Sequence, residues 1–480
     1  MSRAIATRAG LMRWLIALAS AAVIVSPLRA QDAGDADDAF RSGNYQDAIA
    51  IWSKVPPSDS SWLAAQRRLA RAYATIGKYD EAEAVARKAT SAPGGAALWT
   101  TLGETLLLRG KRADAERAFV HATAAHASDS LTAALDLAEL HYDRGEHDRA
   151  YKEFDRFIDV YNATLGASLT SEELVDVATA VAYLGANDPE LFKDALKAFD
   201  RALTADPQDV DAHVKLGELF LRKYNFADAQ TTFDQILESN PHEPRALLGA
   251  ARRRDADGSG GADSLVGVAL SVNPDNVDAL TFRAELLLES EDYAAAQHAV
   301  EHALRVNPTA AHALAVDAAI DFLTHDEPGF ESLRQRALSL DPEDAEFYAT
   351  LAELSAQVRL YRAAADFARQ GTALDPKDWH AWGVLGMNEL RLGQIDSGKV
   401  SLEKSFGGDP STLHVLAWSK EPNRRRCSQH RVSRCLRGAS AVAPREERTT
   451  SALGSMQIAR ASFTPRPAPA KALPLSLRPY

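Results

Sequence analysis

The sequence predicts an all-α protein in which about eleven helix pairs stack into a superhelical solenoid. Alanine is abundant, while aromatic residues make up only 7% of the chain, a composition that favours close-packed helices over a β-sheet core. Prolines recur at intervals of 34, 33, 34, 34, 34 and 34 residues, at Pro207, Pro241, Pro274, Pro308, Pro342, Pro376 and Pro410. Such a period is typical of a repeated helix–turn–helix unit.

Residues 1–30 have the pattern of a secretory signal peptide. Arg3, Arg8 and Arg13 form a basic start, the run WLIALASAAVIV is apolar, and Ala30 lies at the expected cleavage point. The run is too short for a permanent membrane anchor, and no later segment is apolar enough to span a bilayer. We therefore expect an exported protein, periplasmic or secreted, with no stable membrane span after cleavage. Retention of the signal as an uncleaved anchor is the alternative.

Each period of the repeated region has the pattern of two helices. In LWTTLGETLLLRGKRADAERAF, Trp99, Leu102 and Gly103 share one helix face, Gly110 marks a turn, and Phe119 lies on the second helix. The periodic proline ends the second helix, because it lacks an N–H and clashes with the preceding turn. Asp and Asn beside these prolines suit the N-termini of the next helices. Small residues mark the predicted contact on the second helices, at Ala48, Ala82, Ala115, Ala150, Ala195, Ala229, Ala296 and Ala364.

The combined pattern W-x2-L-G, A-x3-F and P resembles the tetratricopeptide repeat family over roughly residues 35–410. The resemblance implies that residues 31–410 form a right-handed solenoid that binds a protein, with a concave face made largely by the first helix of each pair. Three stretches depart from the pattern, and we expect loops or weak points there. YLGANDPELFKDALKAF has a turn about five residues longer than standard, ARRRDADGSGGADSL has a glycine-rich turn, and LTHDEPGFESL carries Pro328 where a helix begins.

Carried over repeat by repeat, the resemblance places one row of glutamates in the inner groove, with apolar residues nearby. Such a row favours a basic or amine-bearing peptide segment. Two alternatives are open: glutamate is a good helix former, and the apolar residues equally suit packing between repeats. Related arrays hold a partner's terminal carboxylate with a Lys, Asn and Arg clamp, which these positions lack. The row is Glu104, Glu139, Glu218, Glu285 and Glu353, and the apolar candidates are Tyr142, Leu221, Phe322, Met387 and Leu390.

The sequence predicts no catalytic residue, metal site or cofactor site. HAVEH, from His298 to His302, matches the H-x-x-E-H string of inverted zinc peptidases. We interpret it as structural, because the packing positions of that helix leave both histidines facing outward. HYDRGEH, with His141 and His147, is expected at the surface, as are the scattered Asp and Glu residues. The chain has no Gly-rich phosphate loop, G-x-S-x-G or H-E-x-x-H motif.

The net charge of −12 is unevenly distributed along the chain. Residues 31–420 carry roughly −25 and residues 421–480 roughly +9. An acidic body disfavours nucleic-acid binding, which needs clustered Lys and Arg. Cys427 and Cys435 are the only cysteines, so the repeats contain no disulfide and their stability must come from packing.

The repeated pattern ends after Pro410. Residues 411–422 are predicted to form a helix that caps the last repeat. Residues 423–480 are rich in Arg, Pro, Ala and Ser and lack Asp, so we expect disorder. Three interpretations are open: a basic arm for an anionic surface or polymer, a flexible tether, or a stretch read out of frame from a GC-rich gene. The abrupt change of composition favours the last.

The sequence therefore supports three functional hypotheses. The first is an exported, non-catalytic scaffold that binds a protein or peptide in its concave groove. The stretch GMNELRLGQIDSGKVSLEKSFGGDP also resembles repeat arrays that precede a secreted gluzincin-like metallopeptidase domain of the peptidase MA type. That resemblance implies a second hypothesis, the interaction half of a peptidase whose zinc domain is absent from this chain. The third is an adaptor whose basic tail binds a membrane or cell-wall surface.

Overall fold

The computed structural model describes residues 30–408, apart from residues 94, 126–129, 165–168, 186–187 and 224. In these residues the chain forms twenty-two α-helices and one short 3-10 helix, and no strand. The predicted all-α class is confirmed. The cap expected at 411–422, the tail at 423–480 and the signal before Ala30 lie outside the described residues.

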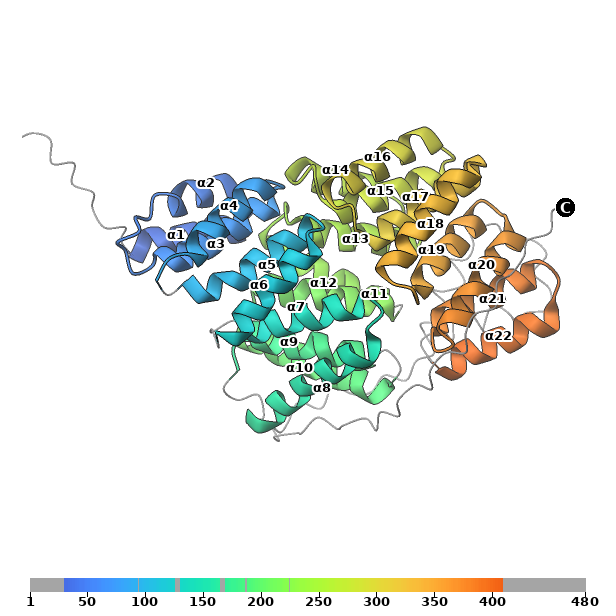
Figure 1. Cartoon of the computed structure of the whole chain (residues 1–480), viewed down its shortest axis with the longest axis horizontal. Helices are drawn as coiled ribbons and strands as arrows, with labels where there is room; N and C mark the ends of the chain where they lie inside the picture. The colour runs from blue at the N-terminus through green and yellow to red at the C-terminus, as the bar shows by residue number, and fades with distance from the viewer. Residues whose placement is uncertain are drawn as a thin grey trace, which may run out of the picture.

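The helices form eleven pairs, each with an odd-numbered first helix and an even-numbered second helix (Figure 1). Their bounds are α1 Ala30–Arg41, α2 Tyr45–Trp52, α3 Trp62–Thr75, α4 Tyr79–Thr90, α5 Leu98–Leu108, α6 Arg112–Ala124, α7 Ser130–Tyr142, α8 His147–Thr164, α9 Ser171–Leu184, α10 Pro189–Ala205, α11 Val210–Arg222, α12 Phe226–Ser239, α13 Pro244–Ala256, α14 Ala262–Val272, α15 Val277–Glu289, α16 Tyr293–Val306, α17 Ala311–Thr324, α18 Glu327–Leu340, α19 Ala345–Gln357, α20 Tyr361–Leu374, α21 Trp379–Arg391 and α22 Ile395–Gly408, with the 3-10 helix η1 at Gly95–Ala97.

Large and small side chains interlock between the two helices of a pair. Phe119 in α6 is fully buried against Gly103 in α5, where a Cβ would lie 2.3 Å from the ring. Phe233 in α12 meets Gly217 in α11 in the same way, at 2.6 Å. A close-packed interior leaves no room for such an overlap, so these positions require glycine. The predicted contact row is 0% exposed throughout, at Ala48, Ala82, Ala115, Ala150, Ala195, Ala229, Ala296 and Ala364.

The periodic Asx–Pro turns connect each pair to the next from α10 onward. The Asn or Asp before the proline accepts a hydrogen bond, through its side-chain oxygen, from the backbone N–H two residues later. These bonds measure 2.8 to 3.1 Å at Asp206, Asn240, Asn273, Asn307, Asp341 and Asp375. A second side chain then caps the next first helix, as Asp209, Asn276 and Asp344 do. The helix-capping role predicted for these residues is confirmed.

The insertion in the fifth pair mostly lengthens a helix instead of a turn. The second helix α10 begins six residues before its packing residue Ala195, whereas α12 begins three residues before the equivalent Ala229. The added residues therefore form roughly one further helical turn. The prediction of a long loop there was wrong, because residues from Pro189 onward satisfy their backbone hydrogen bonds within the helix.

Pro328 also fits its helix. It lies in the first turn of α18, where its missing N–H removes no bond within the helix. Asp326 caps this helix by accepting from the backbone N–H of Gly329 at 3.1 Å. The expectation of a loop or weak point at Pro328 was therefore wrong. The glycine-rich turn expected before α14 is present, at 257–261.

The stack winds far enough for the first four pairs to return beside the turns between pairs six and ten. Figure 1 shows the blue N-terminal helices next to the yellow-green α13 and α14. Asn240 Nδ2 donates to the Tyr45 hydroxyl at 3.0 Å, and Asn273 Nδ2 donates to the Tyr79 hydroxyl at 3.1 Å. These contacts join residues 195 and 194 positions apart. We call this row of contacts the seam, and its residues Tyr45, Tyr79, Asn240 and Asn273 border a cavity on the concave side of the solenoid.

Candidate functional site

A cavity of about 1760 Å³ lies inside the superhelix. First helices from α1 to α21 line it, together with the turns between pairs and the starts of several second helices. This arrangement confirms the prediction that first helices form the concave face. Pockets for small molecules usually measure roughly 300–1,000 Å³, so this cavity has room for a segment of polypeptide.

The wall of the cavity is acidic. Its lining contains seventeen Asp and Glu residues and eight Lys and Arg residues. The imbalance is greatest from Asn276 to His380, where eight lining residues are Asp or Glu and Lys377 alone is Lys or Arg. We call this stretch of wall the acidic half of the cavity. Its low content of Lys and Arg leaves it open to a cationic ligand.

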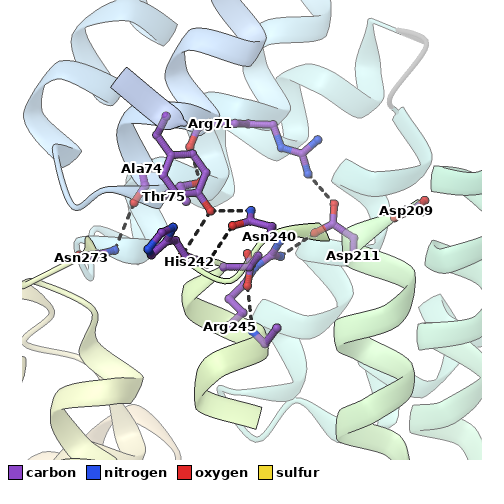
Figure 2. A network of polar contacts seen from close by, with 12 residues as sticks. Arg71, Ala74, Thr75, Asp209, Asp211, Asn240, His242, Arg245 and Asn273 are labelled. Carbon is purple, nitrogen blue, oxygen red and sulfur yellow. Dashed lines mark hydrogen bonds and ion pairs between the residues drawn. The ribbon is translucent and has the colours of Figure 1, made fainter. Parts of the chain in front are cut away.

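Ion pairs offset part of the acidic charge in the other half of the cavity and cross it from wall to wall (Figure 2). Asp211 in α11 accepts from Arg71 in α3 at 2.6 Å and from Arg245 in α13 at 2.5 Å. Arg67 in α3 pairs with Glu172 in α9. Burial raises the pKa of Asp211, but Arg245 and Arg71 outweigh it and hold this pKa well below its usual range. The N-terminal pairs are thereby tied to the middle of the solenoid.

A cluster of carboxyl groups lies beside these ion pairs. Asp176 is only 4% exposed, and Thr132 Oγ1 donates to its Oδ2 at 2.8 Å. Burial raises the pKa of the Asp176 carboxyl to about 8. Burial, followed by the charges of Glu104, Glu139 and Asp176, raises the pKa of Asp136 well above its usual value. These groups lack sufficient positive charge, so the cluster favours protons or an added cation.

Two histidine–glutamate pairs occur in the acidic half. His312 Nε2 lies 2.5 Å from Glu285 Oε1, and His380 Nε2 lies 2.6 Å from Glu353 Oε1. Burial lowers the pKa of His312, but the hydrogen bond and charge of Glu285 outweigh it and raise that pKa to about 8. Burial raises the pKa of Glu353, but the charge and hydrogen bond of His380 hold it below its usual value. A partner's Lys or Arg would compete with these histidines for the same carboxylates.

The structure brings only some of the predicted groove residues to the cavity. Glu104, Glu353, Tyr142 and Leu221 line it. The lining does not include the other six predicted residues, which are Glu139, Glu218, Glu285, Phe322, Met387 and Leu390. Two of these lie next to lining residues: Glu139 is 3.8 Å from Lys215, and Glu285 is hydrogen-bonded to His312. A role in binding stays a prediction for all ten residues.

Phe322 and Leu390 contact neighbouring helices instead. The ring of Phe322 in α17 packs edge-on against Phe367 in α20, with centroids 5.0 Å apart. Leu390 in α21 packs close to Gly398 in α22. These contacts favour the alternative that such apolar residues serve packing between helices.

Sequence reasoning missed one column of lining residues. The second residue of each first helix from α11 to α21 faces the cavity, four positions after the periodic proline. A reading of the sequence four residues beyond each proline would have found them. The column is Asp211, Arg245, Asp278, His312, Glu346 and His380.

Two expectations about polar residues were wrong. His141 is fully buried, and its Nδ1 lies 2.6 Å from Glu153 Oε2, because the end of α7 packs beneath α8. Several acidic residues expected at the surface are also buried, because hydrogen-bonding partners lie within reach inside the stack. Those with less than a tenth of their surface exposed are Glu83, Asp176, Glu243, Asp317, Asp344 and Glu389.

The HAVEH string does not gather metal ligands. His298 is exposed, while His302 Nε2 lies 2.8 Å from Asp275 Oδ1 in the turn between α14 and α15. Across the described ranges, no three His, Cys, Asp or Glu residues are arranged to hold a metal ion. Nor does any helix in these ranges have the length and apolar character needed to cross a membrane.

Comparison with known proteins identifies the repeats. Two family models described as tetratricopeptide repeat match this chain, one at residues 35–96 and 100–163, the other at residues 188–252. Comparison with curated proteins gave no match.

Comparison with solved structures also gave matches, and the three that follow have TM-scores below 0.5. Yeast Tom70 is 14% identical, covering 81% of this chain and 94% of its own, with a TM-score of 0.34. A chain of the Cut9–Hcn1 hetero-tetramer of the APC/C is 14% identical, and the match covers 80% of this chain and 95% of that chain, with a TM-score of 0.33. A tetratricopeptide repeat protein from Parabacteroides merdae is 16% identical, and the match covers 56% of this chain and 99% of that protein, with a TM-score of 0.34. The family models thus identify tetratricopeptide repeats at residues 35–96, 100–163 and 188–252, and a two-helix arrangement recurs in all eleven helix pairs of the described residues.

Proposed function

We propose that this chain is a non-catalytic scaffold that binds a protein partner by holding an extended, basic segment in the central cavity. The observation that carries the proposal is the excess of Asp and Glu in the cavity wall, which is greatest from Asn276 to His380. Complementary charge gives specificity and speeds association. The volume of the cavity supports a polypeptide segment over a small molecule.

Fluorescence anisotropy with a labelled oligolysine peptide tests this function, with oligoglutamate as the opposite probe. The inner variant of the full chain carries Asp278→Asn, Glu346→Gln and Glu353→Gln, all in the cavity wall. Three partly exposed charge pairs at about 0.5 kcal/mol each predict roughly tenfold weaker oligolysine binding. Added salt should weaken the wild-type complex further.

An outer variant controls for net charge. It carries Asp80→Asn, Glu190→Gln and Asp366→Asn, whose side chains are 83%, 75% and 59% exposed. This variant also loses three negative charges, but at sites away from the cavity, so its affinity for oligolysine should stay within a factor of about two of wild type. Equal weakening by both variants would contradict the proposed cavity site, and tighter binding of oligoglutamate would contradict the proposed basic ligand.

We also propose that the protein works outside the cytoplasm, on the strength of the signal pattern in residues 1–30. Expression with its own leader in a bacterial host, followed by fractionation and N-terminal sequencing, checks this. The expected mature protein begins at Gln31 and is recovered from the periplasm or medium. A cytoplasmic product that retains Met1 would contradict export.

A further inference from the structure

The seam is built from one contact repeated four times. In each contact, a glycine turn of one of the first four pairs meets an Asx–Pro turn almost two hundred residues later. The glycines have φ angles of 83°, 79°, 68° and 73°. A Cβ on any of them would lie 2.3 or 2.4 Å from the partner's Oδ1, in the contacts Gly43–Asn240, Gly77–Asn273, Gly110–Asn307 and Gly145–Asp341.

Later pairs show that the turn itself does not demand glycine. Glu291, His325 and Arg359 occupy the same position, two residues before a second helix, with φ angles of 60°, 64° and 68°. These three residues are exposed, so their side chains extend into solvent. Glycine in the first four pairs therefore reflects the close approach across the seam as well as its backbone conformation.

The seam is held by polar contacts. Its hydrogen bonds include Asn273 Nδ2 to the Ala74 carbonyl at 3.3 Å and Asn307 Nδ2 to the Leu107 carbonyl at 3.2 Å. None of the apolar clusters in the described residues joins the first four pairs to pairs seven to ten. A hydrogen bond contributes about 0.5–1.5 kcal/mol net, whereas each helix pair is held by extensive apolar burial. The seam is therefore the weakest boundary around the cavity.

Two ion pairs also hold the second helix pair across the cavity, to the fifth and sixth pairs. Arg67 and Arg71 in α3 reach Glu172 and Asp211 in α9 and α11. An opening that also moves the second pair away from the fifth and sixth pairs would free both carboxylates. Lys or Arg side chains of a partner could then pair with these carboxylates in place of Arg67 and Arg71. The new ion pairs would offset the free energy lost with the original ones.

We propose that the seam is a latch, which opens along its row of contacts to admit an extended segment sideways into the cavity and then closes over it. The entry of a basic segment rests on the proposed function, whereas opening of the seam is a separate property of the chain. Lateral entry allows an internal segment of a folded partner to bind, because no free end needs to thread through the solenoid.

A pair of matched double variants tests whether the latch opens. In Gly77→Ala/Gly110→Ala, each new Cβ meets an Asn Oδ1 at 2.4 Å. In Gly258→Ala/Gly393→Ala, the φ angles are also positive but nothing lies within 4 Å. Both carry similar backbone strain. Small-angle X-ray scattering of the full chain should show a larger radius of gyration for the first variant only, and equal radii for both would overturn the latch.

A reversible crosslink tests whether opening serves binding. Gly77→Cys/Asp275→Cys places two Cβ atoms 3.6 Å apart, within the range of a disulfide, and Asn273→Ala makes room for it. Cys427→Ser and Cys435→Ser remove the native thiols. The probe is an oligolysine segment that joins two folded domains, so it has no free end. The reduced protein should bind this probe, and oxidation should abolish binding until a reductant restores it.

The outcomes separate the two proposals. Equal affinity of the oxidised and reduced proteins for the joined probe would overturn the latch and leave the proposed function standing. Failure of the wild-type protein to bind oligolysine in either form would overturn the proposed function. In that case the scattering comparison of the two double variants still decides whether the seam opens.

Discussion

Asn273 donates a hydrogen bond to the hydroxyl of Tyr79 at 3.1 Å, although 194 residues separate them in the chain. Tyr79 is the first residue of α4, and Asn273 shapes the turn that precedes α15. Asn240 and Tyr45 repeat this relationship one pair earlier, at 3.0 Å. A side chain that completes a local turn thus also joins two turns of the superhelix.

Tyr79→Phe should weaken the seam and leave the helix pairs intact. The change removes the hydroxyl that accepts from Asn273 and keeps the ring, so about 1 kcal/mol of seam stability is lost. Hydrogen exchange should become faster at backbone amides of residues 273–276. Tyr361→Phe is the matched control, because Tyr361 occupies the same position at the start of α20, away from the seam. Identical exchange in both variants would argue against a seam held by this bond.

Asp176→Asn should stabilise the protein at high pH. Burial raises the pKa of Asp176 from 3.8 to about 8, so the folded state binds a proton that the unfolded state has released. Wild-type stability therefore falls as pH rises from about 4 to 8, and the variant escapes this loss. Asn can still accept from Thr132. We expect the variant to be more stable by about 2 kcal/mol at pH 8 and nearly equal at pH 4.

Urea unfolding at both pH values checks the effect of Asp176→Asn. Asp38→Asn is the control, because the Asp38 side chain is 79% exposed and should show no such pH dependence. A constant difference between Asp176→Asn and wild type at all pH values would contradict a carboxyl that is protonated at neutral pH.

His312→Gln should remove a pH-dependent contribution to stability. Glu285 raises the pKa of His312 from 6.5 to about 8, so the folded state holds its proton more tightly. The contribution is fully present below pH 6.5 and disappears as pH rises through 8. The side chain is 41% exposed and is faced by Glu285, Glu346 and Arg252, so solvent screening limits the effect to about 1 kcal/mol.

Thermal unfolding between pH 6 and 9 tests the prediction for His312. The wild-type protein should lose stability over this range relative to His312→Gln. His298→Gln is the control, because His298 lies exposed on α16. An equal change in the pH dependence of thermal stability in His298→Gln and His312→Gln would contradict the prediction for His312.

Gly103→Ala should destabilise the third pair. The new methyl group would lie 2.3 Å from the Phe119 ring, and overpacking of this kind costs about 1–3 kcal/mol. Gly267→Ala is the matched control, because this helical glycine of α14 has nothing within 4 Å of the added Cβ. The control should gain about 0.5–1 kcal/mol from helix propensity. Chemical denaturation of both variants would show opposite signs, and equal signs would contradict the packing described.

The helix pairs could be predicted because the evidence for them is local. Gly103 and Phe119 are close in the chain, and Ala195, Ala229, Ala296 and Ala364 each lie twelve residues before a periodic proline. Burial of both features followed as predicted. The cavity wall could be predicted only in part. Of the predicted glutamate row, only Glu104 and Glu353 line the cavity. The column of lining residues four positions after each proline was not predicted.

His141 and Asp176 show where prediction from sequence stopped. Their neighbours in the sequence suggest a helix end and a helix face, but not which face another helix covers. His141 is buried with Glu153, and Asp176 is buried with Thr132 from the preceding pair. A polar side chain can be buried when a partner is within reach, and that partner lies on a different helix.

The repeating unit, its helices and its turns follow from the amino-acid sequence alone, because they depend on residues within one repeat or in adjacent ones. The contacts of Tyr45 and Tyr79 with Asn240 and Asn273, and the cavity on the concave face, arise from the winding of the whole stack. Each repeat adds a small rotation to the stack, and whether successive turns touch depends on the sum of those rotations. No single repeat encodes that sum.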